Sequence, residues 1–307
     1  MISIQENISL KKYTTFNIGG KARYFVLVKS IEDLKEALKF AEEKELKYFI
    51  LAGGSNVLFS DLGFSGLVIK IDLKEIEINY LKITAGAGVM LSYLIKFSAE
   101  NNLTGIEKLF GIPGTVGGAV RGNAGAFGVE IIDVITQIKA LNIKTGEIKT
   151  LSKEECELKY RSSLFKKNKN WIILEATFEL KIGNQGELKK SMKEIMQKRN
   201  NLQLQSVKTA GSFFTNPVAN EKVQKMFEEE KNTKCRESRV PTGWLLDKVG
   251  LKGERIGDIK ISENQANYFL NLGDGTFDQV LQLSSMAKSR VRDEFNIQLT
   301  EEVEIVY

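Results

Sequence analysis

The chain has 307 residues, of which 42% are hydrophobic and 27% charged, and its formal net charge is +5. This length predicts about two domains, and the composition excludes a largely disordered chain. Lysine and glutamate alternate along the same segments, so the excess charge predicts solvated surface and argues against a nucleic-acid-binding face.

Hydrophobic spacing predicts the elements of the first half of the chain. Ser30 is a good helix N-cap with Asp33 three residues on, and apolar residues recur at helical spacing as far as Glu45. The expected helices are 30–45 and 90–101, and the expected strands are 47–51, 67–71, 80–84 and a hairpin over 134–151 with its turn at 144–146.

In the second half of the chain, strands and helices are expected to alternate less regularly. The expected elements are a strand over 171–181, helices over 187–199, 221–230 and 276–295, and a last strand over 303–307. Because strict strand–helix alternation is not evident, the pattern favours the α+β class over a doubly wound sheet.

The residues that are missing or rare narrow the chemistry. The sequence has no histidine, so a Ser-His-Asp triad, a histidine-ligated haem and an HExxH zinc site cannot be built from it. Its two cysteines, Cys156 and Cys235, form no CxxC pair, so we expect no metal site and two free thiols in a reducing compartment. The sequence shows neither the apolar core of a secretory signal nor an apolar run long enough to span a membrane. We therefore expect a cytoplasmic protein without a membrane partner.

Two glycine-rich segments carry the main signal. Gly53-Gly54-Ser55-Asn56 follows a predicted strand, and a longer run extends over 111–128. Exposed amides in such loops form an anion-binding nest, and glycine lets the backbone approach a ligand closely. No GxxxxGK[ST] motif occurs, and the GxGxxG pattern that begins at Gly86 fails at Leu91. Together the segments predict a pyrophosphate cradle in another fold, although the first segment alone could be a plain turn.

The motifs resemble those of the UDP-N-acetylenolpyruvoylglucosamine reductase family. In chain order they are TTFNIGG (14–20), LAGGSNVLFSDLGFSGLVIKI (51–71), GIPGTVGGAVRGNAGAFG (111–128), YRSSLF (160–165), AGSFFTNP (210–217), GWLLD (243–247) and LTEEV (299–303). The resemblance covers nearly the whole chain and indicates the shorter subtype, which lacks an extra tyrosine-bearing loop.

The resemblance implies an FAD-binding fold of the p-cresol methylhydroxylase and vanillyl-alcohol oxidase type. This domain would cover residues 1–195, in lobes of about 1–72 and 73–195, and an α+β substrate-binding domain would cover residues 196–307. FAD would be held without a covalent bond. The implied cofactor-binding residues are Gly53, Gly54, Ser55, Asn56, Gly111, Ile112, Pro113, Thr115, Gly117, Gly118, Asn123, Ala124 and Gly125.

The family's activity implies roles for five further residues. NADPH reduces FAD, and the reduced flavin reduces the enolpyruvyl ether of a UDP-sugar to UDP-N-acetylmuramate for peptidoglycan synthesis. Arg161 would bind the substrate carboxylate, Ser212 would donate the proton and Glu302 would polarise the enol. Asn216 and Gln265 would contact the UDP-sugar. Without the resemblance, each would be interpreted as an ordinary surface or turn residue.

Two other functions stay open on the sequence alone. One is an oxidase or dehydrogenase on the same FAD fold, although such enzymes often attach flavin through histidine or cysteine, and neither cysteine here lies in a glycine loop. The other is a nucleotide-binding module without catalytic activity. The sequence gives no oligomeric state.

Overall fold

The computed structural model describes residues 2–202 and 207–307, which form two compact units. The first unit comprises Met1–Ile8, Ala22–Gly53 and Ser65–Asn201, and the second comprises Ser9–Lys21, Gly54–Phe64 and Leu202–Tyr307. Two short N-terminal segments therefore belong to the same unit as the C-terminal third of the chain. The expected assignment of FAD binding to residues 1–195 and substrate binding to residues 196–307 stays a prediction.

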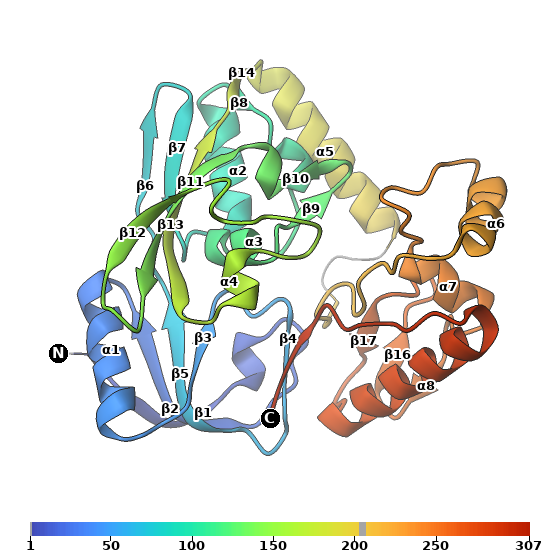
Figure 1. Cartoon of the computed structure of the whole chain (residues 1–307), viewed down its shortest axis with the longest axis horizontal. Coiled ribbons are helices and arrows are strands. Elements are labelled where there is room, and N and C mark those ends of the chain that lie inside the picture. The colour runs from blue at the N-terminus through green and yellow to red at the C-terminus, as the bar shows by residue number, and fades with distance from the viewer. Residues whose placement is uncertain (1, 203–206) are drawn as a thin grey trace. The chain divides into compact units, whose positions relative to one another are not determined.

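The first unit is built on two sheets (Figure 1). One has the order β1 (Gln5–Ser9), β2 (Lys21–Val28), β5 (Phe64–Ile71) and β3 (Tyr48–Leu51), and its edge strand β3 runs parallel to β5. The other has the order β12 (Ile148–Ser152), β11 (Ile135–Asn142), β13 (Trp171–Glu179), β7 (Lys82–Gly86) and β6 (Ile76–Asn79). All neighbouring strands of this second sheet are antiparallel.

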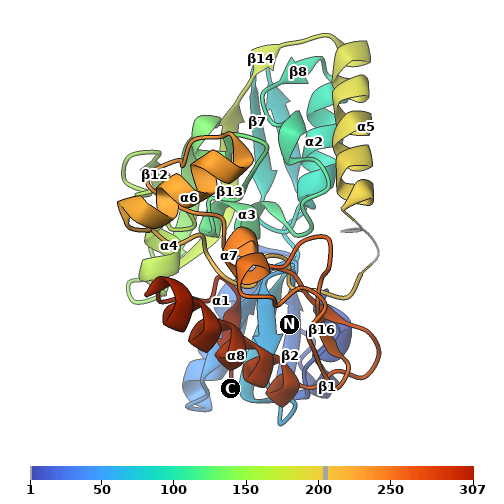
Figure 2. The ribbon, with the colours of Figure 1, turned by 90° about the vertical axis from the view of Figure 1, so that its right-hand side faces the viewer.

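The helices of the first unit share one hydrophobic core with both sheets. They are α1 (Ile31–Glu43), α2 (Leu91–Glu100), α3 (Val116–Arg121), α4 (Leu164–Lys167) and α5 (Gln185–Asn201). Short pairs join β8 (Leu103–Thr104) to β14 (Lys181–Ile182) and β9 (Gly125–Ala126) to β10 (Val129–Glu130). α1 starts where the sequence predicts, because Ser30 and Asp33 form a reciprocal capping box. Figure 2 shows α5 running beside α2.

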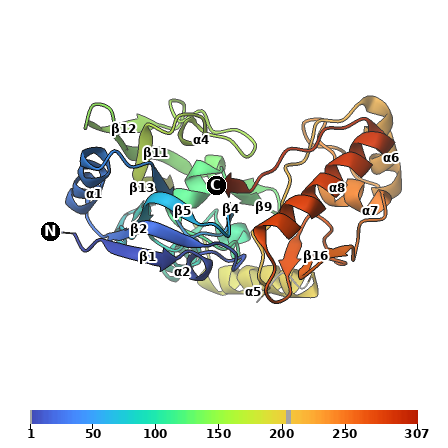
Figure 3. The same ribbon diagram turned by 90° about the horizontal axis from the view of Figure 1, so that it is seen from below.

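The second unit has its own core. Its helices are α6 (Glu221–Lys231), α7 (Thr242–Lys248) and α8 (Phe277–Phe295), and an antiparallel sheet joins β15 (Arg255–Ile256), β16 (Ile259–Ile261) and β17 (Phe269–Asn271). Figure 3 shows α7 and β16 packed along α8. β4 (Val57–Phe59) pairs in parallel with the C-terminal strand β18 (Glu304–Val306), which fixes the end of the chain in this unit.

Most of the predicted elements are confirmed with shifted ends, and so is the α+β class. The predicted strand over 80–84 is wrong at its start, because Tyr80 has a φ of +54° and lies in the turn between β6 and β7. Strands β1, β2, β4 and the three-stranded sheet were not predicted. Within the described residues, no helix is long and apolar enough to cross a membrane.

Candidate functional site

The two glycine-rich segments meet in the first unit, where Gly53 lies against Gly114. A Cβ added at Gly53 would lie 2.6 Å from the Gly114 Cα and 3.1 Å from the Thr115 backbone nitrogen. Because backbone atoms would have to move to admit a side chain, glycine is required for this close approach. Two residues far apart in the sequence, Gly53 and Gly114, therefore lie against each other within the first unit.

The second segment is anchored through some of its own amides. The Val116 N–H donates to the Val89 carbonyl at 2.8 Å, and the Gly117 N–H donates to the Ala87 carbonyl at 2.9 Å. A Cβ at Gly117 would lie 2.8 Å from the Ala87 Cβ, so glycine permits this docking. Two amides at the start of α3 are thus already committed, and a ligand has to be held by other groups of the segment.

Thr115 supplies one such group. It occupies the N-cap position of α3, but its side chain makes no capping hydrogen bond. The residue is 4% exposed, and its buried hydroxyl has no hydrogen-bond partner within residues 2–202 and 207–307. Buried polar atoms are nearly always satisfied, and an unsatisfied hydroxyl costs about 1–3 kcal/mol. A cofactor rich in polar atoms, such as FAD, fits this position because it would satisfy the hydroxyl.

Asn123 has a structural task within the same segment. Its side chain is completely buried, with Nδ2 donating to Glu130 Oε2 at 2.9 Å and to the Lys159 carbonyl at 3.1 Å. Its Oδ1 accepts from the Ile132 N–H at 2.9 Å. The side chain therefore braces three segments, and its predicted part in cofactor binding can only be indirect or through the backbone.

Arg161 is presented on a tight turn of the first unit. Lys159 and Ser162 exchange two backbone hydrogen bonds of 3.0 Å, and Arg161 between them has a φ of +50°. This left-handed conformation is uncommon for a residue other than glycine. Lys166 Nζ donates to the Arg161 carbonyl at 3.1 Å and so helps to hold the turn.

The Arg161 guanidinium lies against the second glycine-rich segment. Nη2 donates to the Gly125 carbonyl at 3.2 Å, and Nη1 donates to the Asn123 carbonyl at 3.4 Å. The guanidinium carbon is 5.3 Å from the centre of the Tyr160 ring. These contacts bring a predicted catalytic residue to two of the predicted cofactor-binding residues, Asn123 and Gly125.

Ser212 belongs to an extended strip of the second unit whose backbone is held by hydrogen bonds. It pairs with Tyr268 as an isolated antiparallel bridge. The next two residues are held by Asn267, whose carbonyl accepts from the Phe213 N–H at 2.7 Å and whose side-chain amide bonds both backbone groups of Phe214, at 3.0 and 2.7 Å. The backbone of the half-buried Ser212 is therefore held by its pairing with Tyr268 and by the hydrogen bonds of the residues that follow it.

Glu302 is attached to the other side of this strip. Its N–H donates to the Phe213 carbonyl at 2.8 Å, and its carbonyl accepts from Asn56 Nδ2 at 3.1 Å. The Asn56 carbonyl in turn accepts from the Glu304 N–H at 3.1 Å. The structure therefore brings the predicted cofactor-binding residue Asn56 to the predicted catalytic residue Glu302, next in space to the strip that carries Ser212.

The neighbouring acid, Glu301, has a different environment. Its Oε1 accepts from Ser284 Oγ at 3.2 Å and forms an ion pair with Lys288, both on α8. These two contacts commit the Glu301 carboxylate to stabilising the second unit.

Asn216 and Gln265 both lie beside the start of α7. Asn216 Oδ1 accepts from the Thr242 N–H at 3.0 Å, and the Asn216 carbonyl accepts from Arg239 Nη1 at 2.9 Å. A side chain at Gly243 would collide with Gln265 Oε1. The two predicted substrate-binding residues therefore share one place in the second unit.

The predicted residues are divided between the two units. Arg161, Gly53 and the residues from Gly111 to Gly125 belong to the first unit. The residues in the second unit are Gly54, Ser55, Asn56, Ser212, Asn216, Gln265 and Glu302.

One polar residue beside the first glycine-rich segment was not predicted. Lys70 lies on β5, and its Nζ donates to the Ala52 carbonyl at 2.9 Å. Burial lowers its pKa, an effect that nearby Asp72 opposes. A single lysine within the apolar strand LVIKI was the available signal.

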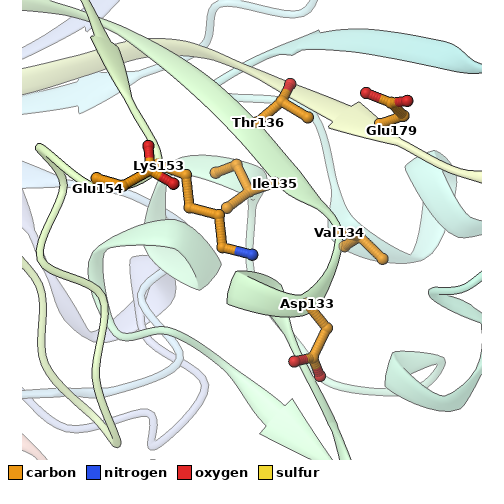
Figure 4. A pocket seen from close by; sticks show the side chains of 7 residues that line it. All are labelled: Asp133, Val134, Ile135, Thr136, Lys153, Glu154 and Glu179. Carbon is orange, nitrogen blue, oxygen red and sulfur yellow. The ribbon is translucent and has the colours of Figure 1, made fainter.

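A pocket of about 370 Å³ lies elsewhere in the first unit (Figure 4). Acidic and basic side chains line it, including Asp133, Lys153 and Glu179, but none of the predicted site residues does. Across the described part of the chain, no group of three or more histidine, cysteine, aspartate or glutamate residues is placed to hold a metal.

Comparisons with known proteins match both parts of the chain. Residues 22–152 match the family model described as FAD binding domain, and residues 202–306 match the C-terminal domain of UDP-N-acetylenolpyruvoylglucosamine reductase. The FAD-binding match confirms the expected FAD-binding fold. Neither model covers half of the chain, so full-length relatives decide the family.

Relatives named UDP-N-acetylenolpyruvoylglucosamine reductase align over the whole length. The protein from Solibacter usitatus is 35% identical over 99% of this chain and 97% of its own length, and that from Clostridium novyi is 35% identical over 99% and 92%. The crystal structure of the Thermus caldophilus reductase covers 100% of this chain and 99% of its own, with 31% identity and a TM-score of 0.77. This chain therefore belongs to the UDP-N-acetylenolpyruvoylglucosamine reductase family.

Proposed function

We propose that this chain is an NADPH-dependent flavoenzyme that reduces UDP-N-acetylenolpyruvoylglucosamine to UDP-N-acetylmuramate, a precursor of peptidoglycan. Its relatives carry the name of this reductase, and the polar, glycine-lined surface around Gly53 and Thr115 fits FAD.

The backbone hydrogen bond from Glu302 to Phe213, the residue next to Ser212, is the observation that carries the proposal. A proton donor and a group that polarises the enol have to act on the two ends of one small conjugated group. They need neighbouring, rigid positions, because small displacements of catalytic groups cost much of the rate. The hydrogen bond between Glu302 and Phe213 supplies such a connection.

The chemistry divides between cofactor and protein. FAD, when bound, supplies the hydride chemistry between NADPH and the vinyl group. Arg161 binds the substrate carboxylate, whose negative charge grows as the vinyl group is reduced. Ser212 donates a proton to the vinyl carbon that does not receive the hydride. Glu302 polarises the enol group that is conjugated with the substrate carboxylate. Since the chain has no histidine, lysine, arginine, tyrosine or water has to restore the Ser212 proton.

The binding of the substrate and the location of the protein are inferred from other residues. Asn216 and Gln265, which both lie beside the start of α7, bind polar groups of the UDP-sugar. NADPH and this nucleotide sugar are the partners. A cytoplasmic location fits the two unpaired cysteines, Cys156 and Cys235.

Steady-state turnover tests the proposal. The purified protein, loaded with FAD, should oxidise NADPH only when the enolpyruvyl UDP-sugar is present, and the product should have the mass of UDP-N-acetylmuramate. NADPH oxidation at the same rate without the sugar, with peroxide as the product, would instead indicate an oxidase on the same fold.

A further inference from the structure

Lys70 is placed directly beside the first glycine-rich segment. It lies opposite Leu51 in the parallel pairing of β5 with β3, and Ala52 is the first residue after β3. The Lys70 ammonium donates to the Ala52 carbonyl at 2.9 Å. This hydrogen bond fixes the peptide that leads into Gly53.

The position of that peptide matters for the second segment as well. Gly53 lies against Gly114 and Thr115, and a Cβ at Gly118 would lie 3.4 Å from the Ala52 Cβ. Within the first unit, Ala52 and Gly53 are therefore the residues that contact the second glycine-rich segment. A shift of the Ala52 peptide would change the surface that both segments share.

The charge of Lys70 is unusual for its place. The strand around it is apolar, with Leu67, Ile69 and Ile71 in the core, and Lys70 itself is only partly exposed. Holding an ammonium here has a desolvation cost, since burial disfavours the charged form. A methionine or leucine could fill the strand without that cost.

We propose that Lys70 is a positioning residue of the FAD site: it fixes the Ala52–Gly53 peptide and places a positive charge beside the glycine-rich surface. FAD carries a negatively charged pyrophosphate, and a partly buried positive charge attracts it with little screening by salt. The inference rests on the FAD-binding part of the proposed function and does not depend on the identity of the substrate.

The test measures FAD affinity directly. Apoprotein of the full chain is titrated with FAD, and the quenching of flavin fluorescence gives Kd for Lys70→Met, Lys70→Arg and the wild type. Lys74→Met is the matched control, because it removes the same charge from an exposed side chain, 64% accessible, close to Lys70. The melting temperature of each apoprotein is recorded in parallel.

We expect Lys70→Met to raise Kd about tenfold or more, as for loss of a hydrogen bond from a charged group. Lys70→Arg should stay within about threefold of the wild type, and Lys74→Met should bind as the wild type does, by the same scale. The apoprotein melting temperature of Lys70→Met should change little, because the loss of the hydrogen bond to the Ala52 carbonyl is offset by the removal of a partly buried charge. If Lys70→Met does not fold, Lys70→Gln, which keeps a donor without the charge, takes its place.

Three results would overturn the proposal: equal affinity of Lys70→Met and wild type, equal weakening by Lys74→Met, or failure of the wild type to bind FAD. Only the last also removes the FAD-binding part of the proposed function. A wild type that binds FAD but does not reduce the UDP-sugar would contradict the proposed reaction and leave the Lys70 comparison intact.

Discussion

The backbone N–H of Glu302 donates a 2.8 Å hydrogen bond to the carbonyl of Phe213, the residue that follows Ser212. Ser212 and Glu302, which are far apart in the sequence, therefore lie on adjacent segments of the second unit. The adjacent Glu301 accepts a hydrogen bond from Ser284 and forms an ion pair with Lys288, both on α8. Adjacent glutamates thus have separate tasks, and the difference can be measured.

Glu302→Gln should lower kcat about 100-fold or more, the usual scale of an acid–base contribution, while FAD binding is retained. Glu301→Gln is the matched control. It weakens the ion pair with Lys288 and should cost about 1 kcal/mol or less of stability, with kcat nearly unchanged. Steady-state kinetics and thermal unfolding of both variants measure these effects. The reverse pattern would assign the catalytic role to Glu301.

Ser212→Ala should leave the reduction of flavin by NADPH nearly intact and slow reoxidation by the UDP-sugar about 100-fold or more. The hydroxyl is needed only for the protonation that completes the product, so the first half-reaction is an internal control. Ser212→Cys, which restores a proton donor, should recover part of the rate. Equal loss in both half-reactions, measured by stopped-flow, would show that Ser212 is structural.

Thr115→Val replaces a buried hydroxyl by a methyl group of the same shape. The hydroxyl has no partner in the part of the protein that the structure describes, so the apoprotein should gain about 1 kcal/mol of stability. FAD affinity should fall about five- to tenfold, because the bound cofactor loses one hydrogen bond. Thermal unfolding of the apoprotein and FAD titration check both effects, and a less stable apoprotein with unchanged affinity would contradict the assignment.

The two cysteines should differ in reactivity. Cys156 is completely buried, and burial, with Glu155 and Glu154 adding to it, raises the pKa of its thiol to about 12. Cys235 is partly exposed. A thiol reagent should therefore label at most Cys235 in the native protein and both cysteines after unfolding. Mass spectrometry of the labelled peptides identifies the sites; rapid native labelling of Cys156 would be the contrary result.

Local signals predicted the local structure well. Ser30, the predicted N-cap, marks where α1 begins, since it exchanges hydrogen bonds with Asp33. The helix predicted over 276–295 begins where Thr276 exchanges hydrogen bonds with Gln279. The error at Tyr80 has a local cause, because an aromatic residue typical of strands takes up a left-handed turn conformation there.

Long-range relationships could not be predicted from spacing. β4 pairs with the C-terminal strand β18, which is far from it in the sequence, and the Asn267 side chain braces Phe214 through two hydrogen bonds. Asn123 was predicted to bind the cofactor, yet its side chain is used inside the protein. Lys70 lies within the 51–71 motif but was given no role, and it supports the glycine-rich surface. Side-chain partners depend on tertiary packing, which one sequence does not encode in its spacing.

Anaerobic half-reactions of the wild-type protein test the central claim most directly. NADPH should bleach the yellow flavin, and the enolpyruvyl UDP-sugar should then restore the colour without oxygen, forming one UDP-N-acetylmuramate for each flavin reoxidised. A reduced flavin that stays bleached with the UDP-sugar, and regains its colour only in air, would contradict the proposed function.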